Sequence, residues 1–298
     1  MRLVAPLVIL ALLLTGCGAP APRSVAQPAG VAIERDIVYH RVGDHELKLD
    51  LYRPEGVSGP LPAVVWIFGG GWLRGGRETC PIAPMAKRGV VIASIDYRLA
   101  DQATFPAQIE DCKAAVRFLR ANAERLGIDP DQIGSFGVSA GGHLAALLGT
   151  SADVPELDGG GDTAVSDAVS FVIACFPATD LSGLCELDGS GDWRMRLAVR
   201  MLLGGDPAEK PELAALASPT THASAGDAPF LLLHGTRDGF IPAWQSRVLH
   251  AGLRGAGVPS RLVLVEGEPH GAWLLANDDV KKAIDRFLDE RLAATAGR

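Results

Sequence analysis

The sequence predicts an α/β fold with a mostly parallel central sheet and helices on both faces. Short apolar runs typical of buried strands alternate with longer segments whose apolar residues recur at helical spacing. Strands that alternate with helices indicate crossover connections, which produce parallel sheets covered on both sides. The chain has 298 residues and is 48% hydrophobic, so it is long enough to form one large core.

The predicted strands are short and are separated by turn residues. In chain order they cover Ile33–Tyr39, Leu47–Tyr52, Ala63–Phe68, Val90–Ile95, Gln132–Phe136, Val169–Cys175, Phe230–Leu233 and Leu262–Val265. The predicted helices cover Pro81–Arg88, Phe105–Leu126, Gly142–Leu148, Arg194–Leu203, Ala243–Leu253 and Asp278–Leu292. Gly127 is expected to end the second of these helices, because glycine readily adopts the left-handed conformation of a helix end.

The alternation is interrupted after the sixth strand, between Cys175 and Phe230. The stretch contains one predicted helix and a Pro-rich segment. We expect a small insertion here, which forms either a cap over the site or two ordinary surface helices. The candidate lid, Ala178 to Thr220, is too short to roof a long groove and also pack against the sheet.

The first residues are expected to direct export and not to join the fold. A positive charge precedes an apolar run from Leu3 to Leu14, and this run is too short to span a bilayer. The run leads into Thr15-Gly16-Cys17, a sequence that looks like a bacterial lipobox. The alternative is an ordinary secretory signal that contains Cys17.

These features divide the chain into three expected segments. Residues 1–16 are a lipoprotein signal peptide, residues 17–32 are a flexible Pro- and Ala-rich tether, and residues 33–298 are the folded domain. Lipidated Cys17 would anchor the exported protein to a bacterial membrane, on its periplasmic or cell-surface side. The membrane is then a partner through the N-terminal lipid only.

The charge balance excludes some partners. Lys and Arg total 28 against 35 Asp and Glu, which gives a net charge of −7. A net negative chain argues against nucleic acid and against anionic lipid headgroups. The cysteines show no paired metal-binding spacing, and no cofactor or metal is expected.

Four cysteines follow the expected tether. They are Cys80, Cys112, Cys175 and Cys185. An oxidising compartment favours disulfides, and four cysteines allow three pairings. Cys80 and Cys112 start predicted helices that flank the strand Val90–Ile95, and a short loop separates Cys175 from Cys185, so we expect these two pairs. Four small buried thiols are the alternative.

A nucleophile elbow is predicted at Gly137-Val138-Ser139-Ala140-Gly141. This stretch fits G-x-S-x-G and lies between a predicted strand and a predicted helix, where such an elbow must lie. Glycines allow the sharp turn to form without a Cβ clash. The turn would expose the hydroxyl of Ser139 at the carboxyl edge of the sheet, where ligands of parallel sheets bind.

A nucleophilic serine needs a base and an acid that orients the base. His270 follows the last strand and Asp238 follows the strand before it, so both return to the same edge of the sheet. The competing base is His234, which we interpret as structural, as we do His143. The competing acid is Asp180, which follows the sixth strand.

The reaction of a serine with an acyl group develops an oxyanion, which needs preorganised donors. Gly69-Gly70-Gly71 follows the third strand, and consecutive glycines let backbone N–H groups point inward together. The backbone N–H groups of Gly70, Gly71 and Ala140 are therefore the predicted oxyanion hole.

Several motifs stand in the order of a known family. They are Phe68-Gly69-Gly70-Gly71-Trp72, Asp96-Tyr97-Arg98-Leu99, Phe105-Pro106-Ala107-Gln108, Gly137-Val138-Ser139-Ala140-Gly141-Gly142-His143 and His234-Gly235-Thr236-Arg237-Asp238. Over about residues 33–293 they resemble the esterase/lipase branch of the α/β hydrolases, and within it the bacterial feruloyl/acetyl-xylan esterase-like (BD-FAE-like) group. The chain departs from that group at Phe68, where related enzymes commonly carry a histidine that braces the oxyanion loop.

The leading hypothesis is a serine carboxylic-ester hydrolase that acts through an acyl-enzyme. Its expected partners are small-molecule or glycan esters with short acyl groups, such as acetylated carbohydrate. A serine peptidase or amidase with the same triad is one alternative. A non-catalytic surface binding protein on a hydrolase scaffold is another, although such proteins typically lose a triad residue and none is lost here.

Overall fold

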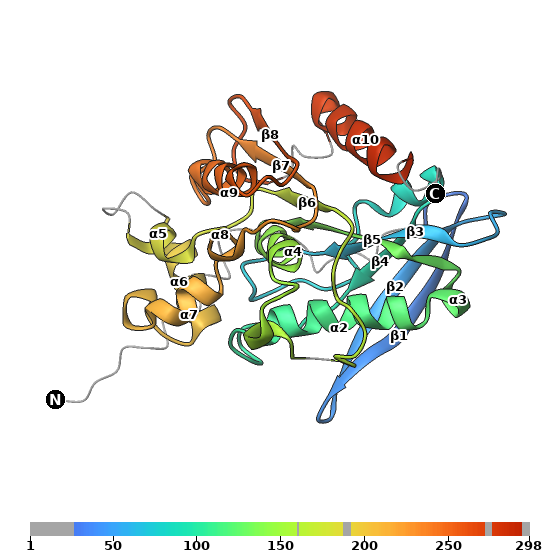
Figure 1. Cartoon of the computed structure of the whole chain (residues 1–298), viewed down its shortest axis with the longest axis horizontal. Helices are drawn as coiled ribbons and strands as arrows, with labels where there is room; N and C mark the ends of the chain where they lie inside the picture. Colours follow the sequence, from blue (N-terminus) through green and yellow to red (C-terminus); the bar gives the residue numbers. More distant parts are fainter. Residues whose placement is uncertain (1–26, 160, 187–191, 272–275, 294–298) are drawn as a thin grey trace.

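The central sheet of the computed structural model has eight strands in the residues that the structure describes (Figure 1). These residues are 27–159, 161–186, 192–271 and 276–293. The strand order is β1-β2-β4-β3-β5-β6-β7-β8. Strand β2 runs antiparallel to both of its neighbours, and the remaining pairs are parallel. The predicted α/β fold with a mostly parallel sheet is therefore confirmed.

Each predicted strand is present, with shifted ends. The strands are β1 (Val31–Val42), β2 (His45–Pro54), β3 (Leu61–Ile67), β4 (Val91–Ile95), β5 (Ile128–Val138), β6 (Val172–Cys175), β7 (Phe230–Gly235) and β8 (Ser260–Val265). Strand β1 begins two residues before the expected domain boundary, because Val31 pairs with Pro54 of β2 and is fully buried.

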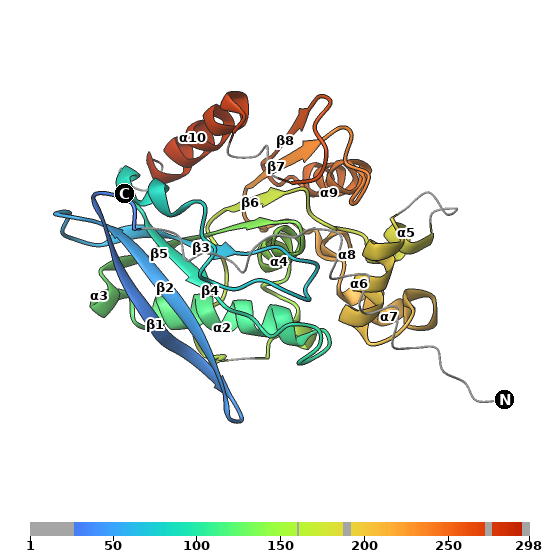
Figure 2. The same ribbon diagram turned by 180° about the vertical axis from the view of Figure 1, so that it is seen from behind.

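The sheet is covered on both faces. The helical segments are η1 (Ala83–Arg88), α2 (Ala107–Ala121), α3 (Ala123–Leu126), α4 (Ala140–Thr150), η2 (Pro155–Leu157), α5 (Leu181–Glu186), α6 (Trp193–Leu203), η3 (Pro207–Glu209), α7 (Pro211–Leu216), α8 (Pro219–His222), α9 (Trp244–Gly255) and α10 (Asp278–Ala293). Figures 1 and 2 show α2 and α10 on opposite sides of the strands. None of the helices in the described part of the chain is long and apolar enough to cross a membrane.

The expected helix from Phe105 to Leu126 is interrupted. It forms α2 and then the short α3, and Asn122 lies between them. The side-chain amide of Asn122 donates to the carbonyl of Phe118 at 2.9 Å, as its backbone N–H does at 3.1 Å, which closes the last turn of α2. Gly127 ends α3 with a left-handed φ of 56°, as predicted.

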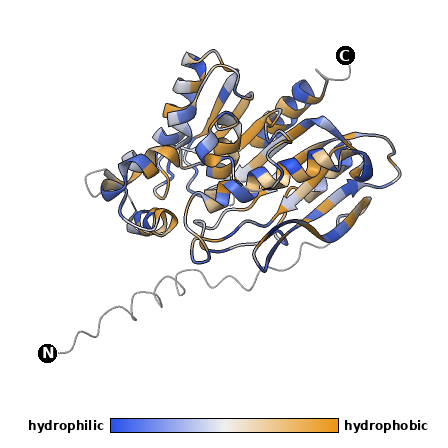
Figure 3. Ribbon diagram, turned by 60° about the horizontal axis from the view of Figure 1, so that its bottom comes forward, coloured by the Kyte–Doolittle hydropathy of each residue, from blue (hydrophilic) through white to orange (hydrophobic). Residues whose placement is uncertain are grey.

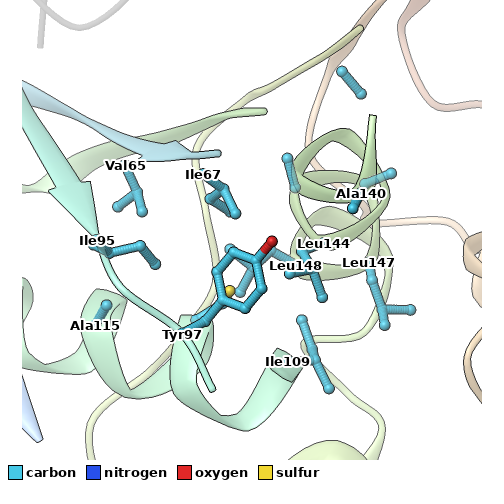
Figure 4. Packing of buried hydrophobic residues seen from close by; sticks show 14 of the residues in the cluster. Val65, Ile67, Ile95, Tyr97, Ile109, Ala115, Ala140, Leu144, Leu147 and Leu148 are labelled. Carbon is cyan, nitrogen blue, oxygen red and sulfur yellow. The ribbon is translucent and has the colours of Figure 1, made fainter. Parts of the chain in front are cut away.

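The sheet divides the apolar core into two clusters. Along β3, Val65 and Ile67 belong to a larger cluster with α2, α4 and α9, whereas Val64 and Trp66 belong to a smaller cluster with η1 and α10. This alternation follows from the period of two in a strand. In Figure 3 the hydrophobic colour is concentrated in the interior. Figure 4 shows the larger cluster, with side chains of β3, β4, α2 and α4 around Tyr97.

The two clusters explain why the predicted disulfides are wrong. All four cysteines are free thiols in the structure: Cys80, Cys112, Cys175 and Cys185. Cys80 and Cys175 belong to the smaller cluster, whereas Cys112 belongs to the larger one and Cys185 packs against it. Each predicted pair is therefore divided between the clusters on the two faces of the sheet, and all four thiols are free. Burial raises the pKa of Cys80 to about 12 and that of Cys185 to about 11, which disfavours the reactive thiolate.

The predicted insertion after the sixth strand is present between β6 and β7. It contains α5, α6, α7 and α8, which gather at one end of the molecule in Figure 1. Its two ends are joined, because Thr220 Oγ1 donates to the Thr179 carbonyl at 2.8 Å and Leu181 N donates to Ser218 Oγ at 2.9 Å. Buried Met195, Val199 and Leu202 attach α6 to the larger cluster. The insertion is therefore packed on the domain.

Candidate active site

Ser139 lies in a sharp turn between β5 and α4. Its φ of 55° and ψ of −122° are unusual for a residue with a side chain, and nucleophile elbows require such strain. The turn is possible because its flanks are glycine. A Cβ on Gly137 would lie 2.0 Å from the carbonyl oxygen of Gly141, much closer than non-bonded atoms approach a Cβ in proteins. The side chain of Ser139 is thereby held at the carboxyl end of β5.

The structure brings together the three side chains of the predicted triad. His270 Nε2 lies 2.9 Å from Ser139 Oγ, and His270 Nδ1 lies 2.7 Å from Asp238 Oδ2. A carboxylate only accepts hydrogen bonds, so Nδ1 carries the proton and Nε2 of the neutral ring is free to accept the Ser139 proton. The three groups therefore form one continuous hydrogen-bonded chain.

Asp238 is held as a carboxylate by the turn after β7. Its Oδ1 accepts the backbone N–H groups of Phe240 and Ile241, each at 2.9 Å. Burial raises the pKa of Asp238, but hydrogen bonds from His234, His270 and the Ile241 N–H lower it by more. The net effect is a pKa well below the ordinary value of 3.8, so Asp238 stays ionised and orients His270.

The two competing residues have other partners. His234 is buried, with Nε2 at 2.8 Å from the carbonyl of Ile241 and Nδ1 at 2.7 Å from Ser246 Oγ. It thus supports the turn that carries Asp238. The carboxylate of Asp180 accepts the N–H of Gly183 at 2.9 Å, at the start of α5. The carboxylate that accepts the hydrogen bond from His270 Nδ1 is therefore that of Asp238, not that of Asp180.

The glycine loop lies directly against the elbow. A Cβ on Gly69 would come within 2.8 Å of the Val138 carbonyl oxygen and 3.2 Å of Ser139 Cβ. Gly70 and Gly71 follow with φ values of 128° and 65°, which glycine tolerates. Ala140 begins α4, so its N–H lies in the first turn of a helix and has no acceptor within that helix. The three predicted donors therefore belong to segments on either side of Ser139.

Contacts of Phe68 support the start of the glycine loop. Its ring stacks on Tyr97, with 4.3 Å between the ring centroids and 14° between the planes. The hydroxyl of Tyr97 donates to the Phe68 carbonyl at 3.1 Å. The next residue, Arg98, binds Asp111 through its guanidinium, and Gln108 donates to the Arg98 carbonyl at 3.0 Å. The motifs around residues 97 and 108 thus hold the segment on which Phe68 stacks.

Two aromatic residues that the sequence reasoning missed flank the imidazole. The ring centroids of Phe176 and Phe240 lie 4.6 Å and 5.1 Å from that of His270. Arg194 of α6 lies over Phe240, with its Cζ 5.6 Å from the ring centroid. Both aromatic residues come just after strands β6 and β7, and that position was the available signal. Within the described residues, no group of three or more metal-ligating side chains is present.

The fold and this site define a protein of the α/β-hydrolase class. The sequence model of the BD-FAE family matches residues 49–253, and the chain belongs to this family. The esterase LipC of Mycobacterium tuberculosis is 34% identical over 240 residues, which cover 76% of this chain and 58% of LipC. The chain spans 56–61% of the length of the curated relatives LipC, LipQ and a probable isoprenylcysteine methylesterase of Arabidopsis thaliana.

Solved structures of esterases have the same fold. A truncated carbohydrate esterase from gut microbiota superposes with a TM-score of 0.80 at 27% identity, covering 90% of this chain and 99% of that one. Esterase 2 of Thermogutta terrifontis, solved with butyrate bound, has a TM-score of 0.72 at 30% identity, and the coverage is 88% and 94%. The same esterase has also been solved phosphonylated by sarin.

Proposed function

We propose that this protein is a serine carboxylic-ester hydrolase that acts through an acyl-enzyme on short-chain esters such as acetylated carbohydrate. One observation carries the proposal. Ser139 Oγ, His270 and Asp238 form a hydrogen-bonded chain with distances of 2.9 Å and 2.7 Å, beside a glycine loop. A serine, a base and an orienting carboxylate in this arrangement are the requirements for nucleophilic attack on an acyl group.

In the first half-reaction His270 Nε2 takes the proton of Ser139 as Oγ attacks the ester carbonyl carbon. The carbonyl oxygen becomes an oxyanion, and the N–H groups of Gly70, Gly71 and Ala140 donate to it. The C–O bond to the alcohol then breaks, and the alcohol leaves with the proton from His270. Asp238 stabilises the imidazolium ion throughout and does not itself take the proton.

In the second half-reaction a water molecule replaces the alcohol. His270 removes a proton from this water, and the resulting hydroxide attacks the acyl-enzyme. The second oxyanion collapses as the bond to Ser139 Oγ breaks, and His270 returns its proton to that oxygen. The carboxylic acid leaves and the enzyme is restored.

The packing around the loop favours small acyl groups. A Cβ on Gly71 would lie 3.6 Å from Ala198 Cβ, so α6 closes directly on the glycine loop. On the other side, Phe176 and Phe240 pack against His270. Relatives also support this substrate class, because they include a carbohydrate esterase and an esterase solved with propionate or butyrate.

Labelling and a substrate series test the proposal. A fluorophosphonate probe should label the wild-type chain once and should not label Ser139→Ala, which should remain folded because it loses only a hydroxyl. Among p-nitrophenyl esters from acetate to palmitate, activity should be highest at about two to four carbons. Full esterase activity in folded Ser139→Ala would overturn the mechanism, and a maximum at long chains would overturn the substrate class.

We also propose that the protein is exported and anchored to a bacterial membrane through a lipid on Cys17, a residue outside the described part of the chain. The apolar run before Thr15-Gly16-Cys17 supports this proposal. A radiolabelled fatty acid should mark the wild-type protein and should not mark Cys17→Ser. A label that remains on Cys17→Ser would show that Cys17 is not the lipidation site.

A further inference from the structure

Trp72, which ends the glycine loop, has an unusual backbone for a bulky residue. Its φ is 59°, and it follows Gly70 and Gly71, which are also in the positive-φ region. A left-handed conformation is unfavourable for a residue with a side chain, so contacts with the surroundings must hold it. Such strain is concentrated at functional sites, and here it lies in the segment that supplies the predicted oxyanion donors.

The surroundings hold Trp72 at two points. Its carbonyl accepts the N–H of Ala100 at 2.8 Å. Its indole Nε1–H donates to His143 Nδ1 at 3.2 Å, and the two rings meet edge to face with centroids 5.2 Å apart. Both side chains are fully buried, so water does not compete for this hydrogen bond.

His143 lies on the helix that carries the nucleophile. It follows Ser139 by one turn of α4, and its backbone N–H donates to the Ser139 carbonyl at 2.9 Å. A contact between His143 and Trp72 therefore fixes the end of the glycine loop relative to the elbow. The stacking of Phe68 on Tyr97 fixes the start of the loop.

The hydrogen bonds of His143 define its tautomer. An indole N–H can only donate, so Nδ1 must accept, and the proton of the neutral ring lies on Nε2. Nε2 then donates to the carbonyl of Ala217 at 2.7 Å, at the end of α7 in the insertion. Burial lowers the pKa of His143 to about 4, which keeps the ring neutral. A proton on Nδ1 would oppose the indole N–H and break the contact.

We propose that His143 is a positioning residue for the oxyanion hole, which through Trp72 holds the N–H groups of Gly70 and Gly71 toward the reacting carbonyl oxygen. The inference rests on the proposed esterase function. It assigns the support at the end of the loop to a histidine of α4, whereas the stacking of Phe68 on Tyr97 supports the start. Because His143 also binds the Ala217 carbonyl through Nε2, this one side chain couples the insertion to the loop.

Variants that remove one hydrogen bond test this role. Trp72→Phe keeps most of the ring and removes the indole N–H. His143→Gln can still accept from Trp72 and donate to Ala217, whereas His143→Leu can do neither. Trp66→Phe is the matched control, because Trp66 is equally buried and donates its Nε1–H to the Thr79 carbonyl at 2.8 Å, in the cluster on the other face of the sheet.

The measurement is the separation of kcat from KM for p-nitrophenyl acetate, with the folded fraction followed by near-UV circular dichroism. Trp72→Phe and His143→Leu should each lower kcat about tenfold and change KM less than about twofold, since misdirected donors weaken transition-state binding most. Their double variant should lose about as much kcat as His143→Leu alone, because both changes break the contact between the indole and the imidazole. His143→Gln should recover most of kcat, and Trp66→Phe should keep it.

The outcomes separate the two proposals. A folded wild-type protein that neither turns over esters nor reacts with a fluorophosphonate would remove the proposed function itself. An active wild-type protein whose folded Trp72→Phe variant keeps full kcat would overturn the positioning role alone. The same role is overturned if Trp66→Phe loses as much kcat as Trp72→Phe, since the loss would then follow stability.

Discussion

Gly141, in the first turn of α4, faces the backbone carbonyl of Ile67 at the end of β3, and a Cβ at position 141 would lie 2.1 Å from that oxygen. The helix of the nucleophile can therefore approach the strand that leads into the glycine loop only because residue 141 lacks a side chain. This close approach brings the elbow and the loop to the same edge of the sheet, since Gly69 in turn lies against Val138 and Ser139.

Gly141→Ala should destabilise the fold and the site together. We expect the free energy of unfolding to fall by about 2–3 kcal/mol, since the helix must move away from the sheet. Gly252→Ala is the matched control on α9, where a Cβ would lie 3.6 Å from Ala223 Cβ, an ordinary contact. It should stabilise the protein by about 0.5–1 kcal/mol, as alanine does within a helix. Equal urea midpoints for the two variants would contradict the close approach.

Asp238→Asn should lower kcat by a factor on the order of 10⁴, because an amide can donate to Nδ1 and stabilise the wrong tautomer of His270. Asp180→Asn should leave kcat nearly unchanged, since its Oδ1 can still accept the N–H of Gly183. Steady-state kinetics with p-nitrophenyl acetate distinguish the two. The acid assignment is wrong if Asp180→Asn is the damaging change.

Four thiols should react in the unfolded, unreduced Cys17→Ser protein, one for each of the cysteines that the structure has as free. In the folded protein all four should react slowly with Ellman's reagent, and half-buried Cys185 should react first because the other three are buried. A reductant should not change the melting temperature. Two thiols or none in the unfolded protein would mean that a disulfide forms.

Stability should depend on the charge of His143. Its pKa is about 4 in the folded protein and 6.5 ordinarily, so between these values the unfolded chain binds more protons. The free energy of unfolding should therefore fall as the pH is lowered from about 6.5 to 4, by up to about 1.4 kcal/mol per pH unit from this group. Above about pH 6.5 the stabilisation from the neutral ring is complete.

The difference between wild type and His143→Gln isolates this contribution, because the buried carboxyls are common to both proteins. Urea unfolding at several pH values measures it. Wild type should lose stability relative to the variant below about pH 6.5. A constant difference from pH 4 to 7 would show that His143 titrates alike in both states.

The strands, the elbow and the position of the insertion could all be predicted from the amino-acid sequence. These features depend on local chemistry. The apolar alternation of β3, the glycines around Ser139 and the left-handed turn at Gly127 restrict the backbone over a few residues, so their signals are complete within short windows. Asp238 and His270 could also be predicted from the sequence, because residues that follow parallel strands meet at one edge of the sheet.

Which side chains meet across the sheet could not be predicted from the sequence and became clear from the folded chain. Cys80 and Cys112 flank the same strand in sequence, yet they lie in clusters on opposite faces. The indole of Trp72 and the ring of His143 are 71 residues apart, and neither carries a local signal for the other. Such contacts depend on how closely the helices pack on the strands. All the side chains between a helix and a strand set that distance, so a short window of sequence does not predict the contact.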